Sequence, residues 1–171
     1  MCGVFDMKNK KKLYILSGVP GCGKSTWARK MVENDNTIEI VSRDKIRFSI
    51  VKEENGYFSQ EDKVFNRYVD DIILSLLDVM NTATIADATQ VNAISRAKLV
   101  MAIQNRWPDF ENEVDIIIVY FHVPFETCVA RNNTRTGREC VPMDAMKRMN
   151  RQHELPAIEY KNHVATYIVR D

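Results

Sequence analysis

The stretch that most constrains this chain is SGVPGCGKST, residues 17–26, which follows the apolar run LYIL directly. Residues 18–25 match the pattern G-x-x-x-x-G-K-[ST] in full. An apolar strand before the pattern and a helix after it are the context of a phosphate-binding loop, and both are expected here, so a chance glycine turn is the weaker interpretation. We therefore expect a parallel α/β fold with this loop at the carboxyl end of a strand.

Each residue type in the loop suits a nucleoside triphosphate. Glycines let the backbone N–H groups converge on phosphate oxygens, and the following helix points its positive end at the same anion. Lys24 is expected to reach the β- and γ-phosphates, and the Ser25 hydroxyl to ligate Mg²⁺. Cys22 is expected at a position where the identity of the side chain matters little. The predicted nucleotide-binding residues of the loop are Gly18, Gly21, Cys22, Gly23, Lys24, Ser25 and Thr26. ATP is the expected donor, because the chain contains no N-K-x-D segment of the kind that selects guanine.

Strand and helix patterns alternate along the rest of the chain. Strands are expected over residues 13–17, 38–42, 84–87, 114–121 and 165–169, and helices over residues 24–33, 45–50, 61–80, 94–107, 125–135 and 143–152. This alternation predicts a parallel sheet of about five strands with helices on both faces. One domain over residues 12–171 is expected, preceded by a flexible basic leader over residues 1–11.

Composition narrows the class of protein. Twenty-four cations against 23 anions give a net charge of +1, so a contact with nucleic acid would be local. The four cysteines are widely spaced, which argues against zinc and a disulfide framework and fits the cytoplasm. The longest apolar run, VDIIIVYFHV, is too short to span a bilayer.

A candidate acceptor site follows the second strand, in VSRDKIR. Asp44 at the tip of that strand could accept the proton of an attacking hydroxyl. Arg47 lies one helical turn further on, and its planar fork suits a phosphodiester, with Arg43 assisting. The alternative is that Ser42 or Asp44 only caps a helix, and the spacing alone does not decide between the two.

Two further groups could complete the site. Arg131 and Arg135 are four residues apart, so we expect them to share a helix face in a mobile lid, with Gly137 as a hinge. A solvated helix end rich in cations is the alternative. Asp87 closes the third strand and could hold hydrated Mg²⁺ or position the acceptor, or it could cap the next turn.

The order and spacing of GVPGCGKSTWAR, SRDKIRFSIV, IADATQVN and FHVPFETCVARNNTRTGRECVPMDAMKRM resemble those of phage-type 5′-polynucleotide kinases, over about residues 12–160. The resemblance implies that Lys24 and Ser25 hold ATP and metal, that Asp44 is the general base for a 5′-hydroxyl and that Arg47 grips the adjacent phosphate. It also implies that Arg135 is a lid residue on the ATP phosphates, supported by Arg131, and that Asp87 is important. The phosphatase domain of some such kinases is not expected, and the segment over residues 52–80 departs from the family.

Three functions follow from these observations. The first is transfer of the γ-phosphate of ATP, with Mg²⁺, to the 5′-hydroxyl of DNA or RNA. The second is a small-molecule kinase for a nucleoside, sugar or similar alcohol, and the third is a nucleotide-binding switch without transfer. Arg47 argues against a neutral acceptor, whereas the low net charge argues mildly for one. A homo-oligomer and a functional partnership with a nucleic-acid ligase are left open.

Overall fold

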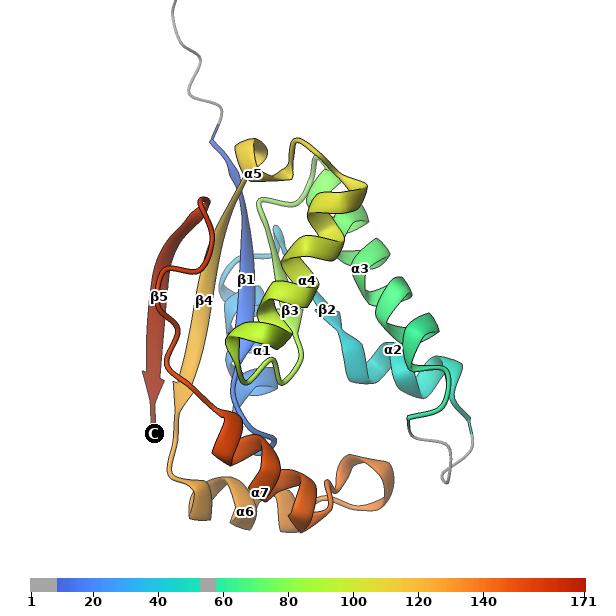
Figure 1. The fold of residues 1–171 in the computed structure, drawn as a ribbon, viewed down its shortest axis with the longest axis vertical. Helices are drawn as coiled ribbons and strands as arrows, with labels where there is room; N and C mark the ends of the chain where they lie inside the picture. Colours follow the sequence, from blue (N-terminus) through green and yellow to red (C-terminus); the bar gives the residue numbers. More distant parts are fainter. Residues whose placement is uncertain (1–8, 53–57) are drawn as a thin grey trace, which may run out of the picture.

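A computed structural model of the 171-residue chain describes residues 9–52 and 58–171. Its centre is a five-stranded parallel sheet in the order β2-β3-β1-β4-β5 (Figure 1). The strands are β1 (Lys11–Ser17), β2 (Ile38–Ser42), β3 (Ala83–Asp87), β4 (Val114–His122) and β5 (His163–Arg170). The predicted fold class and the predicted strands are confirmed.

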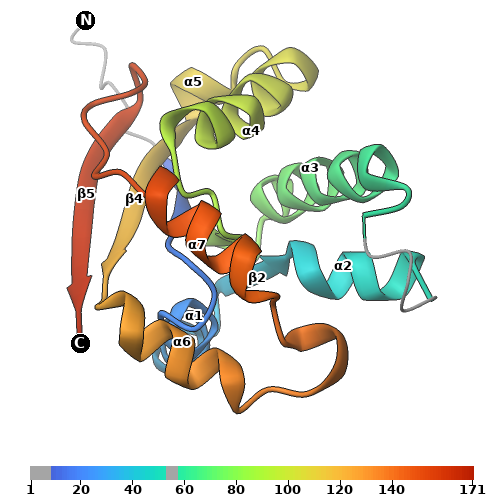
Figure 2. The ribbon, with the colours of Figure 1, turned by 60° about the horizontal axis from the view of Figure 1, so that its bottom comes forward.

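Helices connect the strands and cover both faces of the sheet. They are α1 (Lys24–Asn34), α2 (Arg43–Ile50), α3 (Glu61–Leu77), α4 (Ala93–Arg106), α5 (Phe110–Glu113), α6 (Phe125–Asn133) and α7 (Met143–Gln152), with a 3₁₀ turn, η2 (Gly137–Glu139). Because all five strands run the same way, their carboxyl ends meet at one edge of the sheet. Figure 2, which brings this edge forward, shows α1, α2, α6 and α7 gathered around it.

The alternation of side chains along β1 divides the core into two layers. Leu13 and Ile15 pack with α3 and α4 on one face, whereas Tyr14 and Leu16 pack with α1, α6 and α7 on the other. In β4 every residue from Ile116 to Phe121 is buried, which is the pattern of a central parallel strand covered on both sides.

The described ends of several elements differ from the expected ones for local reasons. Lys11 lies in β1 rather than in a leader, and its ammonium donates to the carbonyl oxygens of Asp78, at 2.7 Å, and Asn81. Residues 1–8 of the expected leader lie outside the described residues. Helix α3 ends at Leu77 rather than Met80, because Asp78 is extended and its Oδ1 accepts the N–H of Met80 at 2.9 Å.

Within residues 9–52 and 58–171, no helix is both long and apolar enough to cross a membrane.

Candidate active site

The predicted phosphate-binding loop joins β1 to α1 and depends on two glycines with left-handed backbone. Gly21 has φ +83°, and Gly23, the N-cap of α1, has φ +98°. A Cβ on Gly21 would lie 2.3 Å from the carbonyl oxygen of Cys128 in α6. Glycine has no Cβ, so it can adopt this left-handed backbone and also let the Cys128 carbonyl come this close. The loop therefore packs directly against α6.

Cys22 lies under the loop, not at its margin. Its side chain is buried, and a Cβ on Gly18 would lie 2.5 Å from its Sγ. The Cys22 side chain is therefore packed against the loop, and the expectation that its identity matters little stays a prediction. Cys22 can still serve a phosphate through its backbone.

The Lys24 ammonium is folded back over the loop. Its Nζ donates to the carbonyl oxygens of Gly18 at 2.8 Å and Val19 at 3.0 Å, and the residue is 8% exposed. A triphosphate held by the loop N–H groups would meet this ammonium. Thr26 is exposed one position beyond Ser25, and its Oγ1 accepts a hydrogen bond from Arg29 at 3.4 Å.

Ser25 and Asp87 bring two oxygen donors together from the loop and from the end of β3. The Ser25 hydroxyl donates to Oδ2 of Asp87 at 3.1 Å. Burial raises the pKa of Asp87, although the charge of Lys24 and the hydrogen bond from Ser25 act in the opposite direction. A hydroxyl and a carboxylate fit Mg²⁺, which prefers oxygen ligands and commonly completes its shell with waters and substrate phosphates. The residues that the structure describes contain no cluster of three or more His, Cys, Asp or Glu side chains that could hold a metal by themselves.

The first turn of α2 separates the two interpretations of VSRDKIR. Ser42 is the N-cap, and its Oγ accepts the N–H of Lys45 at 3.5 Å. Asp44 lies in the first turn with a side chain that is 63% exposed, and its Oδ1 accepts a hydrogen bond from Nη1 of Arg47 at 2.5 Å. The cap is therefore Ser42, and Asp44 and Arg47 form a pair on one side of the helix.

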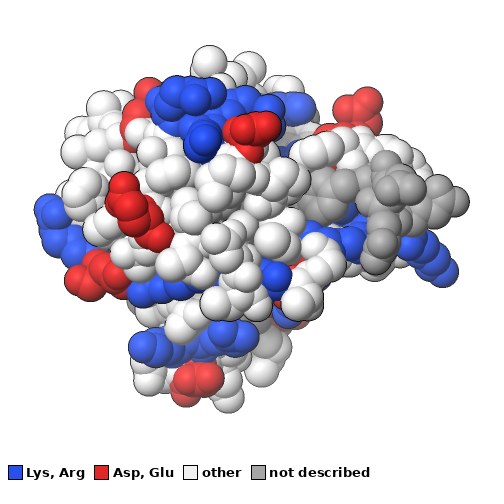
Figure 3. Space-filling model, turned by 90° about the horizontal axis from the view of Figure 1, so that it is seen from below, with Lys and Arg blue, Asp and Glu red and all other residues white. Residues whose placement is uncertain are grey.

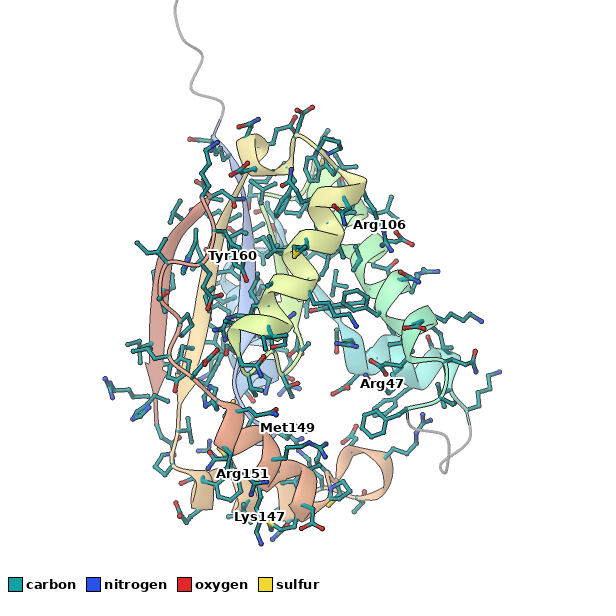
Figure 4. All side chains as sticks on the ribbon, viewed as in Figure 1. Arg47, Arg106, Lys147, Met149, Arg151 and Tyr160 are labelled. Atoms are coloured by element: carbon teal, nitrogen blue, oxygen red, sulfur yellow. The ribbon has the colours of Figure 1, made fainter. Side chains whose placement is uncertain are left out.

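A third segment of the chain holds this pair. Glu61, in the first turn of α3, accepts hydrogen bonds from Nη2 of Arg47 at 3.1 Å on both carboxylate oxygens. The same carboxylate pairs with Arg43. The Arg47 side chain is 7% exposed, so two carboxylates fix a nearly buried guanidinium. Figure 4 shows Arg47 on α2, across from α7, whose Lys147 and Arg151 lie at the lower end of the molecule in this view.

The predicted donor and acceptor residues lie close enough to affect one another electrostatically. The charge of Lys24 lowers the pKa of the Asp87 carboxyl, and the charge of Asp44 raises it. Tyr68, on α3, is fully buried, and burial raises the pKa of its hydroxyl. The charges of Asp87 and Asp44 raise this pKa further, whereas the charge of Arg43 lowers it. The structure thus brings together residues from the loop, α2, β3 and α3.

The predicted lid arginines do not share a helix face. Helix α6 ends at Asn133, so Arg131 is in its last turn while Arg135 lies beyond it. The cause is local: Thr134 turns back, its Oγ1 donating to the carbonyl oxygen of Arg131 at 2.8 Å. Arg131 pairs with Asp171 at 2.6 Å, and the Arg135 side chain is exposed. The expectation of a shared helix face is wrong.

The segment that carries Arg135 is a loop fixed at its root and at its tip. At the root, the buried Asn132 side chain accepts the N–H of Val141 at 3.0 Å and donates to its carbonyl oxygen at 2.8 Å. At the tip, Arg138 donates to the carbonyl oxygen of Val51 at 2.5 Å and lies 4.6 Å from the ring centroid of Phe48. The loop therefore reaches across to α2, the helix that carries Asp44 and Arg47.

Comparison with known proteins identifies the family of the chain. A family model described as an AAA domain, AAA_33, matches residues 13–156, which is most of the chain. The chain belongs to this family. The structural neighbours described next show that its fold is that of P-loop kinases.

Three solved structures share this fold. A fungal RNA kinase matches with a TM-score of 0.68 and 13% identity over 93% of this chain and 73% of that chain. A chain of the Pnkp1/Rnl/Hen1 RNA repair complex matches with a TM-score of 0.65 and 27% identity over 86% of this chain and 45% of that chain. A sugar kinase from Janibacter sp. HTCC2649 matches with a TM-score of 0.61 and 15% identity over 94% and 85%. This chain spans less than half of the repair-complex chain. The predicted resemblance to polynucleotide-type P-loop kinases is confirmed for family and fold.

The sequence alone did not indicate that Glu61 and Tyr68 belong to this site. Glu61 has the position of an acid that merely complements a helix dipole, and Tyr68 has that of a core residue in the apolar pattern of α3. Their spacing of seven, with Phe65 between them, places both on one helix face. That spacing was the available signal, but nothing in the sequence indicates that the face meets Arg43 and Arg47.

Proposed function

We propose that this P-loop kinase transfers the γ-phosphate of ATP to the 5′-hydroxyl end of DNA or RNA. The observation that carries the proposal is the pair formed by exposed Asp44 and nearly buried Arg47 at the start of α2. A carboxylate suits acceptance of a hydroxyl proton, and a fixed guanidinium suits a phosphodiester beside that hydroxyl.

The chemical step follows from these roles. The acceptor oxygen gives its proton to the Asp44 carboxylate while it bonds to the γ-phosphorus. The bond from that phosphorus to the bridging oxygen breaks, and ADP leaves with the electron pair. Lys24 and the loop N–H groups hold the β- and γ-phosphates. Mg²⁺, held by Ser25 and Asp87, would neutralise charge on the phosphates.

Charge near the transferring group is also assigned to the loop after α6. Arg135 is exposed on that loop, and we assign it to the ATP phosphates, where one arginine can contribute roughly 10³–10⁵-fold to the rate. Arg131, tied to Asp171, supports the root of the loop. Both roles rest on the family resemblance together with the exposure of Arg135.

Other observations support a nucleic-acid acceptor held by local contacts. Two structural neighbours are described as an RNA kinase and as a component of an RNA repair complex. The net charge is +1, and Figure 3 shows cations and anions interspersed on the face that contains the carboxyl ends of the strands. The end of a nucleic-acid strand, which makes few phosphate contacts, suits such a surface better than a long duplex does. Self-association and partnership with a ligase stay predictions.

A small-molecule kinase is the second candidate, and a specific observation favours it. Asp44 and Glu61 already balance much of the charge of Arg47, so this guanidinium does not by itself require an anionic acceptor. A sugar kinase also shares the fold. A nucleotide-binding switch without transfer is the least supported, because the chain keeps both the loop lysine, Lys24, and a carboxylate, Asp44, that could accept a proton.

A γ-phosphate transfer screen with ATP and Mg²⁺ separates these functions. We expect phosphate to move to 5′-hydroxyl oligonucleotides of DNA, RNA or both. A parallel panel of nucleosides and sugars should accept little. Transfer to a sugar or nucleoside with none to oligonucleotides would overturn the proposal in favour of the small-molecule reading. Nucleotide binding without any transfer would favour the switch.

A further inference from the structure

One face of α3 borders the candidate acceptor site. Glu61, Phe65 and Tyr68 are spaced four and three residues apart, so they lie on the same side of the helix. Glu61 pairs with Arg43 and Arg47, and Phe65 lies against Arg43, so this side of α3 faces the α2 residues of the candidate site.

Two side chains of this face each join a pair of cations. Glu61 binds both Arg47 and Arg43. Phe65 has the Arg43 guanidinium carbon 5.3 Å from its ring centroid and the Lys98 ammonium 4.7 Å from it. Because Glu61 and Phe65 are one helical turn apart, the three cations follow one another along the face, from α2 to α4.

Lys98 is the outer member of this row. It lies in the second turn of α4, it is exposed, and among the described residues it forms no ion pair. An ammonium on a flexible stem beside an aromatic ring is retained by the ring but stays open to an anion. Rows of cations interleaved with aromatic side chains are how proteins follow a single-stranded backbone.

We propose that Arg43 and Lys98, which both lie against the Phe65 ring, form a subsite for the second backbone phosphate of a polynucleotide acceptor. The inference rests on the proposed function, in which Arg47 takes the phosphate next to the 5′-hydroxyl. The row selects a polymer over a mononucleotide, because only an acceptor with at least two phosphates reaches Lys98. Glu61 sets the inner limit of the subsite, since it already shares its carboxylate between Arg43 and Arg47.

The test compares acceptors that differ by one phosphate. The probes are a nucleoside 3′-phosphate, a 5′-hydroxyl dinucleotide with a 3′-phosphate, and a 5′-hydroxyl tetranucleotide. For the wild-type protein the KM should fall by about fivefold from the first probe to the second, the size of one partly exposed charge contact. Lys98→Ala should remove that gain while leaving the nucleoside 3′-phosphate KM, the ATP KM and kcat unchanged. Lys98→Arg should restore the gain.

A matched control excludes an effect of total charge. Lys161, at the opposite edge of the sheet just before β5, is an exposed lysine, and Lys161→Ala should change none of the KM values. For the tetranucleotide, Lys98→Ala should also reduce the slope of log KM against log salt by about 0.7, the loss of one single-strand phosphate contact.

The outcomes separate the two proposals. If the wild-type protein phosphorylates all three probes with the same KM, or if Lys98→Ala raises the KM of all three equally, the subsite is overturned and the proposed function stands. If none of the three probes is phosphorylated, the proposed function fails and the subsite fails with it.

Discussion

The donor half and the acceptor half of this site are built by different means. The proposed donor half is centred on one continuous loop, residues 18–25, in which Lys24 donates to a loop carbonyl oxygen and Ser25 donates to Asp87. The proposed acceptor half is a set of side chains from α2 and α3 joined by ion pairs, and the loop after α6, which carries Arg135, contacts α2 through Arg138. A backbone cradle tolerates change poorly but is fully encoded in one stretch, whereas a side-chain assembly can be retuned one residue at a time.

The sharpest way to test this contrast is to remove the proposed base. Asp44→Asn keeps the shape and the α2 turn but cannot accept a proton, so we expect kcat to fall by about 10²–10⁴-fold. The affinity for ATP should stay unchanged, because the donor half does not include Asp44. Steady-state transfer to a labelled oligonucleotide and ATP-binding titration measure the two quantities. Full activity of the variant would remove Asp44 from the mechanism.

The next largest effect separates acceptor binding from donor binding. Arg47→Ala removes charged hydrogen bonds, so the acceptor KM should rise by about 10- to 100-fold while the ATP KM moves little. Arg67→Ala is the control, because Arg67 is an exposed α3 arginine paired only with Asp71 among the ion pairs of the described residues. Equal increases in both KM values would make Arg47 a general structural residue.

A third measurement asks whether the contact between α2 and the loop after α6 positions Arg135. Arg138→Ala releases the loop from Val51 and Phe48, so we expect kcat to fall by about tenfold because Arg135 is no longer held over the site. Phe48→Leu should act through the same contact. In a double-mutant cycle the two changes should be non-additive by about 1 kcal/mol. Strict additivity would show that the contact does not place the loop.

The smallest expected shift concerns Asp87, where the two halves meet. Folding raises the pKa of Asp87, so the folded state holds the proton more tightly, and the ionised carboxyl destabilises it at neutral pH. Asp87→Asn should therefore raise Tm at pH 7, without ATP or Mg²⁺, by about 2–4 °C, and it should abolish transfer. The difference in Tm should shrink as the pH falls and disappear below the ordinary pKa of 3.8, where the carboxyl is protonated in both states.

The opposite sign is informative as well. A lower Tm for Asp87→Asn at pH 7 would mean that the hydrogen bond from Ser25 outweighs the cost of burying the charge. Differential scanning calorimetry across the pH range distinguishes the two cases.

The same contrast explains what could be predicted from the sequence. The strands and the phosphate-binding loop were predictable because each depends on neighbouring residues: apolar runs, glycines and a following helix. Asp44 and Arg47 were predictable because one helical turn joins them. Glu61 was not, since it lies 14 residues beyond Arg47 in a different helix, and neither was the contact of Arg138 with Val51, 87 residues away.

The wrong prediction for Arg131 and Arg135 has a local cause. A four-residue spacing predicts a shared helix face for Arg131 and Arg135 only if the helix continues, and the side chains of Asn132 and Thr134 end it. Both residues can bond to nearby backbone, which competes with helical hydrogen bonding. The pattern of cations alone carries no information on that competition.

The contact of Gly21 with the Cys128 carbonyl joins the phosphate-binding loop to helix α6. With no room for even a methyl group between them, the loop and the middle of α6 behave as a single rigid mount. If the proposed role of Arg135 holds, we expect any movement of the loop after α6 to begin beyond Asn133, so substitutions within residues 134–140 should affect the position of Arg135 more than the packing of the phosphate-binding loop.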